Sequence, residues 1–412
     1  MIYLDYQATA PLAPEAAAAI RPWLESEFGN PHSSHRLGRQ AAAAVEVARG
    51  RVVEALTEPG CPKDIRSSRA KSRGEGAASS RAPLDYARDE RGLAPAPLPT
   101  GRLYFTSGAT EAINWALKGA ASRLPPDRRR IVTLATEHAA VLDTIEWLAG
   151  QGFETVILPV AADGLVSLAD VESAVDARTG LVAAMLVNNE IGVIQPVAEI
   201  GAVARRAGAL LLCDAVQGFG RVPIPLDGCD LVAVSAHKVH GPKGIGGLWV
   251  RDGVPLDPLF HGGGQEGGLR SGTLSPALCV GFGEAARLLI ERGEADHAHV
   301  EKLWRAAREA MPGWTLNGSE PARYRGNLNL RRDGVDSSRL ISEVREVAFS
   351  SGSACASGSG RPSHVLAALG LSERQARSSI RLGFGRYTSE EDLLRALALI
   401  EAAASRQLSF AA

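Results

Sequence analysis

Leu231-Val-Ala-Val-Ser-Ala-His-Lys238 is the most informative segment for the architecture, because four apolar residues are followed by polar and basic ones. A short apolar run bounded in this way is typical of a buried strand in a parallel sheet. Similar runs recur along the chain and alternate with amphipathic stretches. The apolar runs are 103–106, 131–134, 155–158, 181–187, 210–213, 231–234 and 247–250.

Helical patterns separate most of these runs, at 110–121, 139–149, 168–175 and 197–207. Repeated strand–helix–strand units predict an α/β protein with a mostly parallel sheet between helices. After about residue 290 the pattern changes to long helices, near 295–311, 363–369 and 389–405, with a few strands. We therefore expect a large domain over residues 15–293 and a smaller α+β domain made of residues 1–14 and 294–412.

The segment at about residues 58–100 interrupts this alternation. It is rich in Arg, Ser, Ala, Gly and Pro and has no sustained apolar period. Such a composition buries too little apolar surface to offset the entropy lost on ordering. We expect a disordered insert without a catalytic role; a docking arm for an acidic partner is the alternative.

Composition excludes several classes of function. The net charge of −1 gives no support to a nucleic-acid or membrane-surface role, and no apolar run reaches the ~20 residues of a membrane span. Residues 1–6 lack a basic-then-apolar pattern, so we expect no secretory signal. The 5 cysteines are widely spaced and form no CxxC pair, which predicts neither a disulfide framework nor a metal site. A reducing, cytoplasmic compartment fits best.

Polar residues that follow the predicted strands are candidates for a site, because parallel sheets bind ligands at the carboxyl ends of their strands. Lys238 there suits a Schiff-base lysine, and Asp214 suits a partner for the pyridine nitrogen of pyridoxal phosphate. Gln217 can reach the phenolic oxygen of the same ring. Taken singly, a surface lysine and a helix N-cap are the commoner explanations.

Three other strands end in the same manner. The run 107–111 opens a helix, where the backbone N–H groups, with Ala109 among them, and the Thr110 hydroxyl form an anion site suited to a phosphate. His138 can stack on a pyridine ring and move protons. Asn189 follows the strand 181–187. Five strand ends with suitable polar residues predict a phosphate-bearing cofactor, with pyridoxal phosphate as the best candidate.

Cys355 lies within a run of small residues, 350–360. A small core residue is the usual role of a cysteine and fits Cys213, Cys229 and Cys279, which sit among apolar or strand residues. Nothing near Cys355 can form a core, so an exposed, mobile thiol is expected. Arg381 offers a guanidinium that can bind an amino-acid carboxylate through two parallel hydrogen bonds; an ordinary exposed arginine is the alternative.

Together these motifs resemble the cysteine desulfurases of the NifS/IscS type, in the class V aminotransferase group of fold-type I pyridoxal-phosphate enzymes. The likeness spans nearly the whole chain except about residues 58–100. It is carried by Tyr3 to Tyr6, Gly29 to Pro31, Thr106 to Glu111, Thr136 to His138, Val187 to Gly192, Asp214 to Gln217, His237-Lys238, Gly241 to Gly244, His261 to Gly264, Arg270 to Thr273, Ser350 to Cys355 and Ser378 to Arg381.

The resemblance implies conversion of L-cysteine to L-alanine, with sulfur carried as a persulfide on the nucleophile Cys355 to an acceptor protein. It makes Lys238 the Schiff-base lysine, Asp214 the pyridine partner and His138 the stacking acid–base group. Other roles follow by the same resemblance. Thr110, Ser235 and His237 hold the phosphate, Thr273 reaches the phosphate of the other subunit in a homodimer, and Asn189 and Arg381 take the substrate carboxylate.

Alternatives remain at this point. The chain departs from the family pattern at Gln7, Ala10 and Ala236, which concerns fine positioning more than chemistry. Selenocysteine lyase activity or another class V reaction is one alternative, although transamination has no use for the Cys355 thiol. A non-catalytic scaffold is another. The destination of the sulfur, whether iron–sulfur clusters, tRNA thiolation or nitrogenase maturation, is left undecided.

Overall fold

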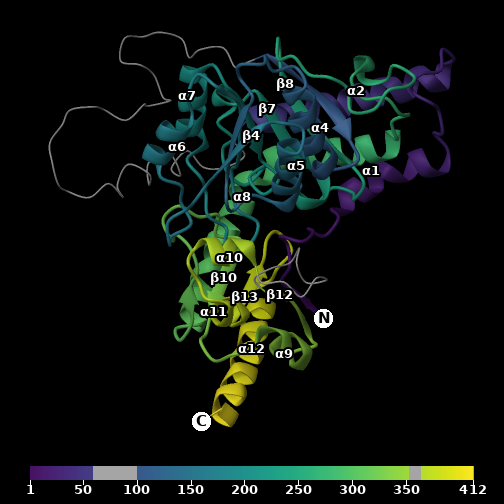
Figure 1. The fold of residues 1–412 in the computed structure, drawn as a ribbon. Helices are drawn as coiled ribbons and strands as arrows, with labels where there is room; N and C mark the ends of the chain where they lie inside the picture. Colours follow the sequence, from purple (N-terminus) through teal and green to yellow (C-terminus); the bar gives the residue numbers. More distant parts are fainter. Residues whose placement is uncertain (59–99, 352–362, 412) are drawn as a thin grey trace, which may run out of the picture.

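The computed structural model describes residues 1–58, 100–351 and 363–411. The insert expected at 58–100 therefore lies outside the described residues except for its two end positions, and so does Cys355. Two bodies are visible in Figure 1, a larger one with the main sheet and a smaller one that contains both chain ends. The site residues are distributed over both.

A seven-stranded sheet forms the centre of the larger body, in the order β2-β8-β7-β6-β5-β3-β4. Strand β8 is antiparallel to both of its neighbours, and every other adjacent pair from β7 to β4 is parallel. The prediction of a mostly parallel sheet is thus confirmed. The strands are β2 (Gly101–Thr106), β3 (Arg130–Leu134), β4 (Glu154–Leu158), β5 (Thr179–Met185), β6 (Leu210–Asp214), β7 (Leu231–Ser235) and β8 (Gly246–Arg251).

Helices cover both faces of this sheet. Side chains alternate along a strand, so Leu181 and Ala183 of β5 pack in one apolar cluster while Val182 and Ala184 pack in another. The first cluster contains α4 (Ala109–Ala121) and α5 (Ala139–Ala149). The second contains α2 (Arg36–Thr57), α6 (Leu168–Ala174), α7 (Val197–Ala207) and the first part of α8 (Pro276–Ala310). The strands read as uninterrupted apolar runs in the sequence because both of their faces are buried.

The smaller body has its own apolar cluster, to which the last turns of α8 contribute Val300, Leu303 and Trp304. Its four-stranded sheet has the order β12-β13-β10-β9, and a separate strand pair joins β1 to β11. The strands are β1 (Ile2–Tyr3), β9 (Thr315–Leu316), β10 (Asn327–Arg331), β11 (Val347–Ala348), β12 (Ser350–Ser351) and β13 (Ser379–Gly383). The helices are α9 (Ser337–Glu343), α10 (His364–Ala368), α11 (Glu373–Arg377) and α12 (Glu390–Ala411).

Several predicted elements have different bounds, among them the helix expected at 389–405, which extends to Ala411. The helix expected at 295–311 begins at Pro276, where the hydroxyl of Ser275 caps it by accepting a hydrogen bond from Leu278 N. The boundary predicted at residue 293 falls inside this helix, and the division into domains stays a prediction. The strand expected at 181–187 spans Thr179–Met185, and Leu186 N still donates to Asp214 O just beyond its end.

Helices α1 (Pro14–Glu25) and α2 pack on α8 and were not predicted from the sequence. Both are rich in alanine, and their apolar faces are therefore weakly marked. Among the described helices, none combines the length and the apolar character needed to cross a membrane.

Candidate active site

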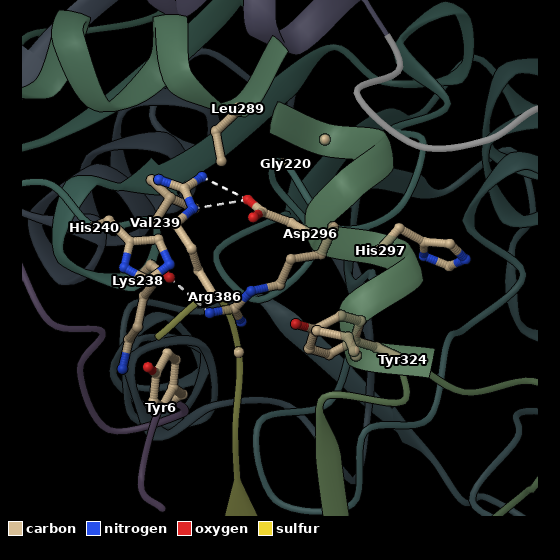
Figure 2. Close-up of a pocket in the computed structure, with 14 residues that line it drawn as sticks. Tyr6, Gly220, Lys238, Val239, His240, Leu289, Asp296, His297, Tyr324 and Arg386 are labelled. Carbon is tan, nitrogen blue, oxygen red and sulfur yellow. Dashed lines mark hydrogen bonds and ion pairs between the residues drawn. The ribbon is translucent and has the colours of Figure 1, made fainter. Parts of the chain in front are cut away.

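Lys238 lies at the carboxyl edge of the main sheet, at the end of a short 3-10 turn (Ala236–Lys238) that follows β7. Its Nζ donates to the carbonyl oxygens of Gln7, at 2.6 Å, and Ala8, at 2.8 Å. In Figure 2 the Lys238 side chain extends along the side of a cavity where Tyr6 lies. The N-terminal segment from the smaller body thus holds the amine of a residue of the larger one.

Asp214 ends β6, the strand next to β7, and is buried. Its Oδ1 accepts a hydrogen bond of 3.0 Å from Val216 N. Burial raises the pKa of Asp214, while the Val216 N–H and the charges of His138 and Lys238 oppose that rise. An acid in this setting is suited to share a proton with a basic nitrogen placed beside it.

Gln217 is buried three residues after Asp214, and its Nε2 donates to Gln7 O at 2.9 Å. The Gln7 carbonyl therefore accepts from both Gln217 and Lys238. The importance of Gln7 and Ala8 was not predicted, because they act through main-chain carbonyls, which every residue possesses.

His138 follows β3 and caps the N-terminus of α5, where its Nδ1 accepts from Ala140 N at 3.0 Å. The neutral imidazole therefore carries its proton on Nε2. The preceding residue, Glu137, is fully buried, and its Oε1 accepts from Met185 N at 2.7 Å. Burial raises the pKa of Glu137 well above its ordinary value, and the nearby Asp214 adds to the rise although Met185 N–H opposes it. Glu137 belongs to the family motif Thr136 to His138, but the sequence predicts no role for it.

The residues predicted to bind the phosphate lie at or after the ends of β2 and β7, the two strands on either side of β8. Thr106 of β2 and the buried Ser235 of β7 are both register partners of Gly246. A Cβ at Gly246 would lie 2.8 Å from the carbonyl carbon of Gly108, so glycine is needed for the turn before α4 to approach β8. Helix α4 starts at Ala109, and Thr110 in its first turn is exposed.

His237 adjoins this end of the site and its Nδ1 lies 3.3 Å from Thr9 Oγ1. Burial, followed by the charge of Lys238, lowers the pKa of His237 to about 4. The ring is therefore neutral at pH 7 and can donate or accept a hydrogen bond without adding charge.

Arg381 lies on β13 of the smaller body and is 1% exposed, which excludes the alternative of an ordinary surface arginine. Its Nη2 lies 2.7 Å from Asp5 Oδ1, and its Nη1 donates to the main-chain oxygen of Asn189 at 3.1 Å. Its Nε has no hydrogen-bond partner among the described residues. The structure thus brings Asn189 and Arg381 together, although the contact uses the Asn189 backbone.

A cavity between the two bodies adjoins Lys238 (Figure 2). Tyr6, Tyr324 and Arg386 line it from the smaller body and Asp296 lines it from α8. Arg386 Nε donates to Asp296 Oδ2 at 2.8 Å. Within the described part of the chain, no group of three or more His, Cys, Asp or Glu side chains is arranged to hold a metal ion.

Two predicted residues remain, Thr273 and Cys355. Thr273 is exposed on the segment between β8 and α8. Cys355 lies outside the described residues, but the chain on either side of residues 352–362 can be placed. Ser350 is the register partner of Arg381, the Ser363 hydroxyl donates to the Glu190 carboxylate, and His364 Nε2 lies 2.9 Å from Glu137 O.

Known proteins resemble this chain over most of its length. The Aminotransferase class-V family profile matches residues 99–395. The cysteine desulfurase IscS of Rickettsia bellii is 40% identical over 408 residues, which cover 97% of this chain and 90% of the relative.

Solved structures agree with this comparison. A NifS-like protein superposes with a TM-score of 0.82 at 31% identity, covering 98% of this chain and 99% of the other. SspA in complex with cysteine superposes with a TM-score of 0.75 at 32% identity, covering 94% of this chain and 100% of the other. The fold class and the resemblance inferred from the sequence are confirmed. The chain belongs to the class-V aminotransferase family and, within it, to the cysteine desulfurases.

Proposed function

We propose that this cysteine desulfurase uses pyridoxal 5'-phosphate bound at Lys238 to take sulfur from L-cysteine, releases L-alanine and carries the sulfur on Cys355. The observation that supports it most is the placement of the Lys238 amine and the buried Asp214 carboxylate at the ends of adjacent strands. The buried guanidinium of Arg381 supplies the third element, an anchor for an amino-acid carboxylate.

The residues present fit pyridoxal phosphate. Asp214 has the raised pKa and the burial of an acid that can hydrogen-bond a pyridine nitrogen, and Gln217 lies beside Lys238. The N–H groups at the start of α4, including that of Ala109, and the side chains of Thr110, Ser235 and His237 are suited to a phosphate. When bound, the cofactor supplies an electron sink for the Cα of the substrate.

The protein moves protons and holds the substrate. The Lys238 amine, held by the carbonyls of Gln7 and Ala8, is placed to take and return the Cα proton. His138, with its proton on Nε2, is the second proton carrier. The substrate carboxylate binds Arg381, whose Nε–H has no hydrogen-bond partner among the described residues. Asn189, which follows β5 and contacts Arg381 through its main-chain oxygen, assists in binding the carboxylate.

Sulfur transfer requires a thiolate. Cys355 loses its proton and attacks the substrate sulfur; a sulfur–sulfur bond forms, the carbon–sulfur bond breaks, and its electron pair stays with the carbon that becomes alanine. The flanks of the Cys355 segment support this role, because Ser350 pairs with Arg381 and His364 contacts Glu137. Cys213, Cys229 and Cys279 are buried, and burial raises the pKa of Cys279 to about 12.

The proposal extends to assembly and destination. We propose a homodimer in which Thr273, exposed in one chain, reaches the phosphate of the partner subunit. The persulfide is then delivered to a sulfur-acceptor protein in the reducing cytoplasm, for iron–sulfur clusters or another sulfur pathway. We propose no role for nucleic acid or membrane. The larger domain at 15–293 binds the cofactor, and the smaller one carries Cys355.

Borohydride reduction followed by mass spectrometry tests the cofactor site. The purified protein should be yellow, and reduction should fix the cofactor to Lys238. An adduct on Lys243, or no adduct, would refute the assignment.

Product analysis with L-cysteine and a reductant tests the reaction. Cys355→Ser should keep the cofactor spectrum and lose nearly all sulfide release, whereas the matched control Cys279→Ser should retain it. A Cys355 variant that keeps most of its activity would contradict the proposed sulfur path.

A further inference from the structure

Arg221 joins two residues of the proposed site and belongs to none of the motifs described above. Its Nη1 donates to Oε1 of Gln217 at 2.5 Å, and its Nη2 donates to the main-chain oxygen of Lys238 at 2.6 Å. The Tyr324 ring lies 5.2 Å from the guanidinium carbon. Burial lowers the pKa of Arg221, but an arginine keeps its charge at neutral pH.

The contact with Arg221 determines the orientation of the Gln217 side-chain amide. An amide has one accepting and one donating end, whereas a guanidinium only donates. Facing Arg221, the Gln217 amide must present Oε1, and its Nε2 then donates to Gln7 O at 2.9 Å. A reversed amide would place donor against donor at Arg221 and acceptor against acceptor at Gln7. In the observed orientation one N–H of Nε2 remains for a further acceptor.

We infer that Arg221 is a positioning residue that fixes the Gln217 amide so that it donates a hydrogen bond to the phenolic oxygen of the bound cofactor. This rests on the proposed function, because it requires the cofactor at Lys238. Hydrogen bonding to an ionised oxygen favours its charged form. The pH midpoint of the cofactor's visible absorbance therefore reports the contact, and a residue that only supports the fold does not move it.

A double-mutant cycle on the purified, cofactor-loaded enzyme, in whatever oligomeric state it is obtained, tests the inference. Arg221→Met and Gln217→Leu should shift the absorbance midpoint in the same direction and by similar amounts. In the Gln217→Leu background, Arg221→Met should add no more than about a third of its own single shift. The single Arg221→Met change should also reduce kcat/KM by about tenfold, the effect of one lost hydrogen bond from a charged donor.

Arg221→Lys is the matched control, because it keeps a charged donor at the position. With Arg221→Lys, the absorbance midpoint should lie close to the wild-type value. If Arg221→Met does not fold, Arg221→Gln takes its place in the cycle. An unchanged midpoint in the Arg221 variants, or two shifts that simply add, would overturn the inference. A wild type in which borohydride fixes no cofactor to Lys238 would instead refute the proposed function itself.

Discussion

The two ends of the proposed cofactor site differ in construction. At the ring end, Asp214 and Gln217 are buried, and they are tied to the backbone by hydrogen bonds within one chain. At the phosphate end, Ser235 is buried but Thr110 is exposed. The ring end is thus closed by residues of this chain, whereas the more open phosphate end supports the proposal that a second subunit contributes Thr273 there.

The largest effect is expected at Lys238, where the ring end meets the substrate. Lys238→Ala should reduce alanine formation by at least about 10³-fold, because both the covalent attachment and the proton carrier are lost. Lys243→Ala, five residues on, is the matched control and should stay near wild type. The rate of alanine release from L-cysteine measures both. Equal losses in the two variants would show that charge alone, and not the position of Lys238, is required.

Asp214→Asn should come next, with a fall in kcat of roughly 10²–10³-fold. The amide keeps the shape of the carboxyl group but cannot share a proton with the pyridine nitrogen, so the electron sink is weakened. Cofactor content should remain near stoichiometric, which separates this variant from one that has lost the site. Steady-state kinetics and the cofactor-to-protein absorbance ratio check the prediction. A variant with full activity would remove Asp214 from the ring end.

Thr273→Ala should produce a smaller change, confined to the phosphate end. Losing one hydrogen bond to a phosphate should raise the dissociation constant of the cofactor by about tenfold and leave kcat nearly unchanged when the cofactor is in excess. Equilibrium dialysis gives the constant, and sedimentation should show a wild-type dimer. A fully active monomer would contradict the proposal that a second subunit completes this end.

The smallest effects concern stability and should have opposite pH dependence at the two ends. Burial raises the pKa of Glu137. Ionising its carboxyl group therefore destabilises the fold; this destabilisation is absent below the ordinary pKa of 4.5 and grows as pH rises above it. For Glu111, burial is outweighed by hydrogen bonds from Arg270 and Ser107, and the pKa falls. Glu111 therefore contributes stability above pH 4.5 that is lost as pH falls through its lowered pKa.

Urea unfolding of the cofactor-free protein at several pH values separates the two carboxylates. Relative to wild type, Glu137→Gln should gain stability as pH increases from 4 to 7. Glu111→Gln should match wild type at low pH and lose about 1 kcal/mol or less at pH 7. Parallel curves for the two variants would remove the distinction between the two ends.

The sequence predicts the sheet well because its strands are buried on both faces and read as uninterrupted apolar runs. The start of α8 was missed, since Gly281, Gly283 and several alanines in its first turns leave no clear apolar period. These glycines are required by packing: a Cβ at Gly283 would lie 2.6 Å from Ala48 Cα of α2. Such close helix contacts depend on a partner that is distant in sequence.

The candidate site was predicted as a set of strand ends, and the structure places Lys238, Asp214, His138 and Ser235 at those ends. The contributions of Gln7, Ala8 and Arg221 could not be predicted. The first two act through carbonyl groups, and Arg221 acts on other residues of the site through side-chain and main-chain oxygens. Networks of this kind are set by tertiary contacts and leave no spacing pattern in the sequence.

The pairing of β1 with β11 has a consequence for biosynthesis. Ile2 is synthesised about 345 residues before its partner Val347. At roughly 5–20 residues per second, the N-terminal segment waits roughly 20–70 s for this strand to appear. The same segment carries Asp5 and the carbonyls that hold Lys238. The nascent chain therefore cannot assemble the proposed site until the strand that contains Val347 has been synthesised.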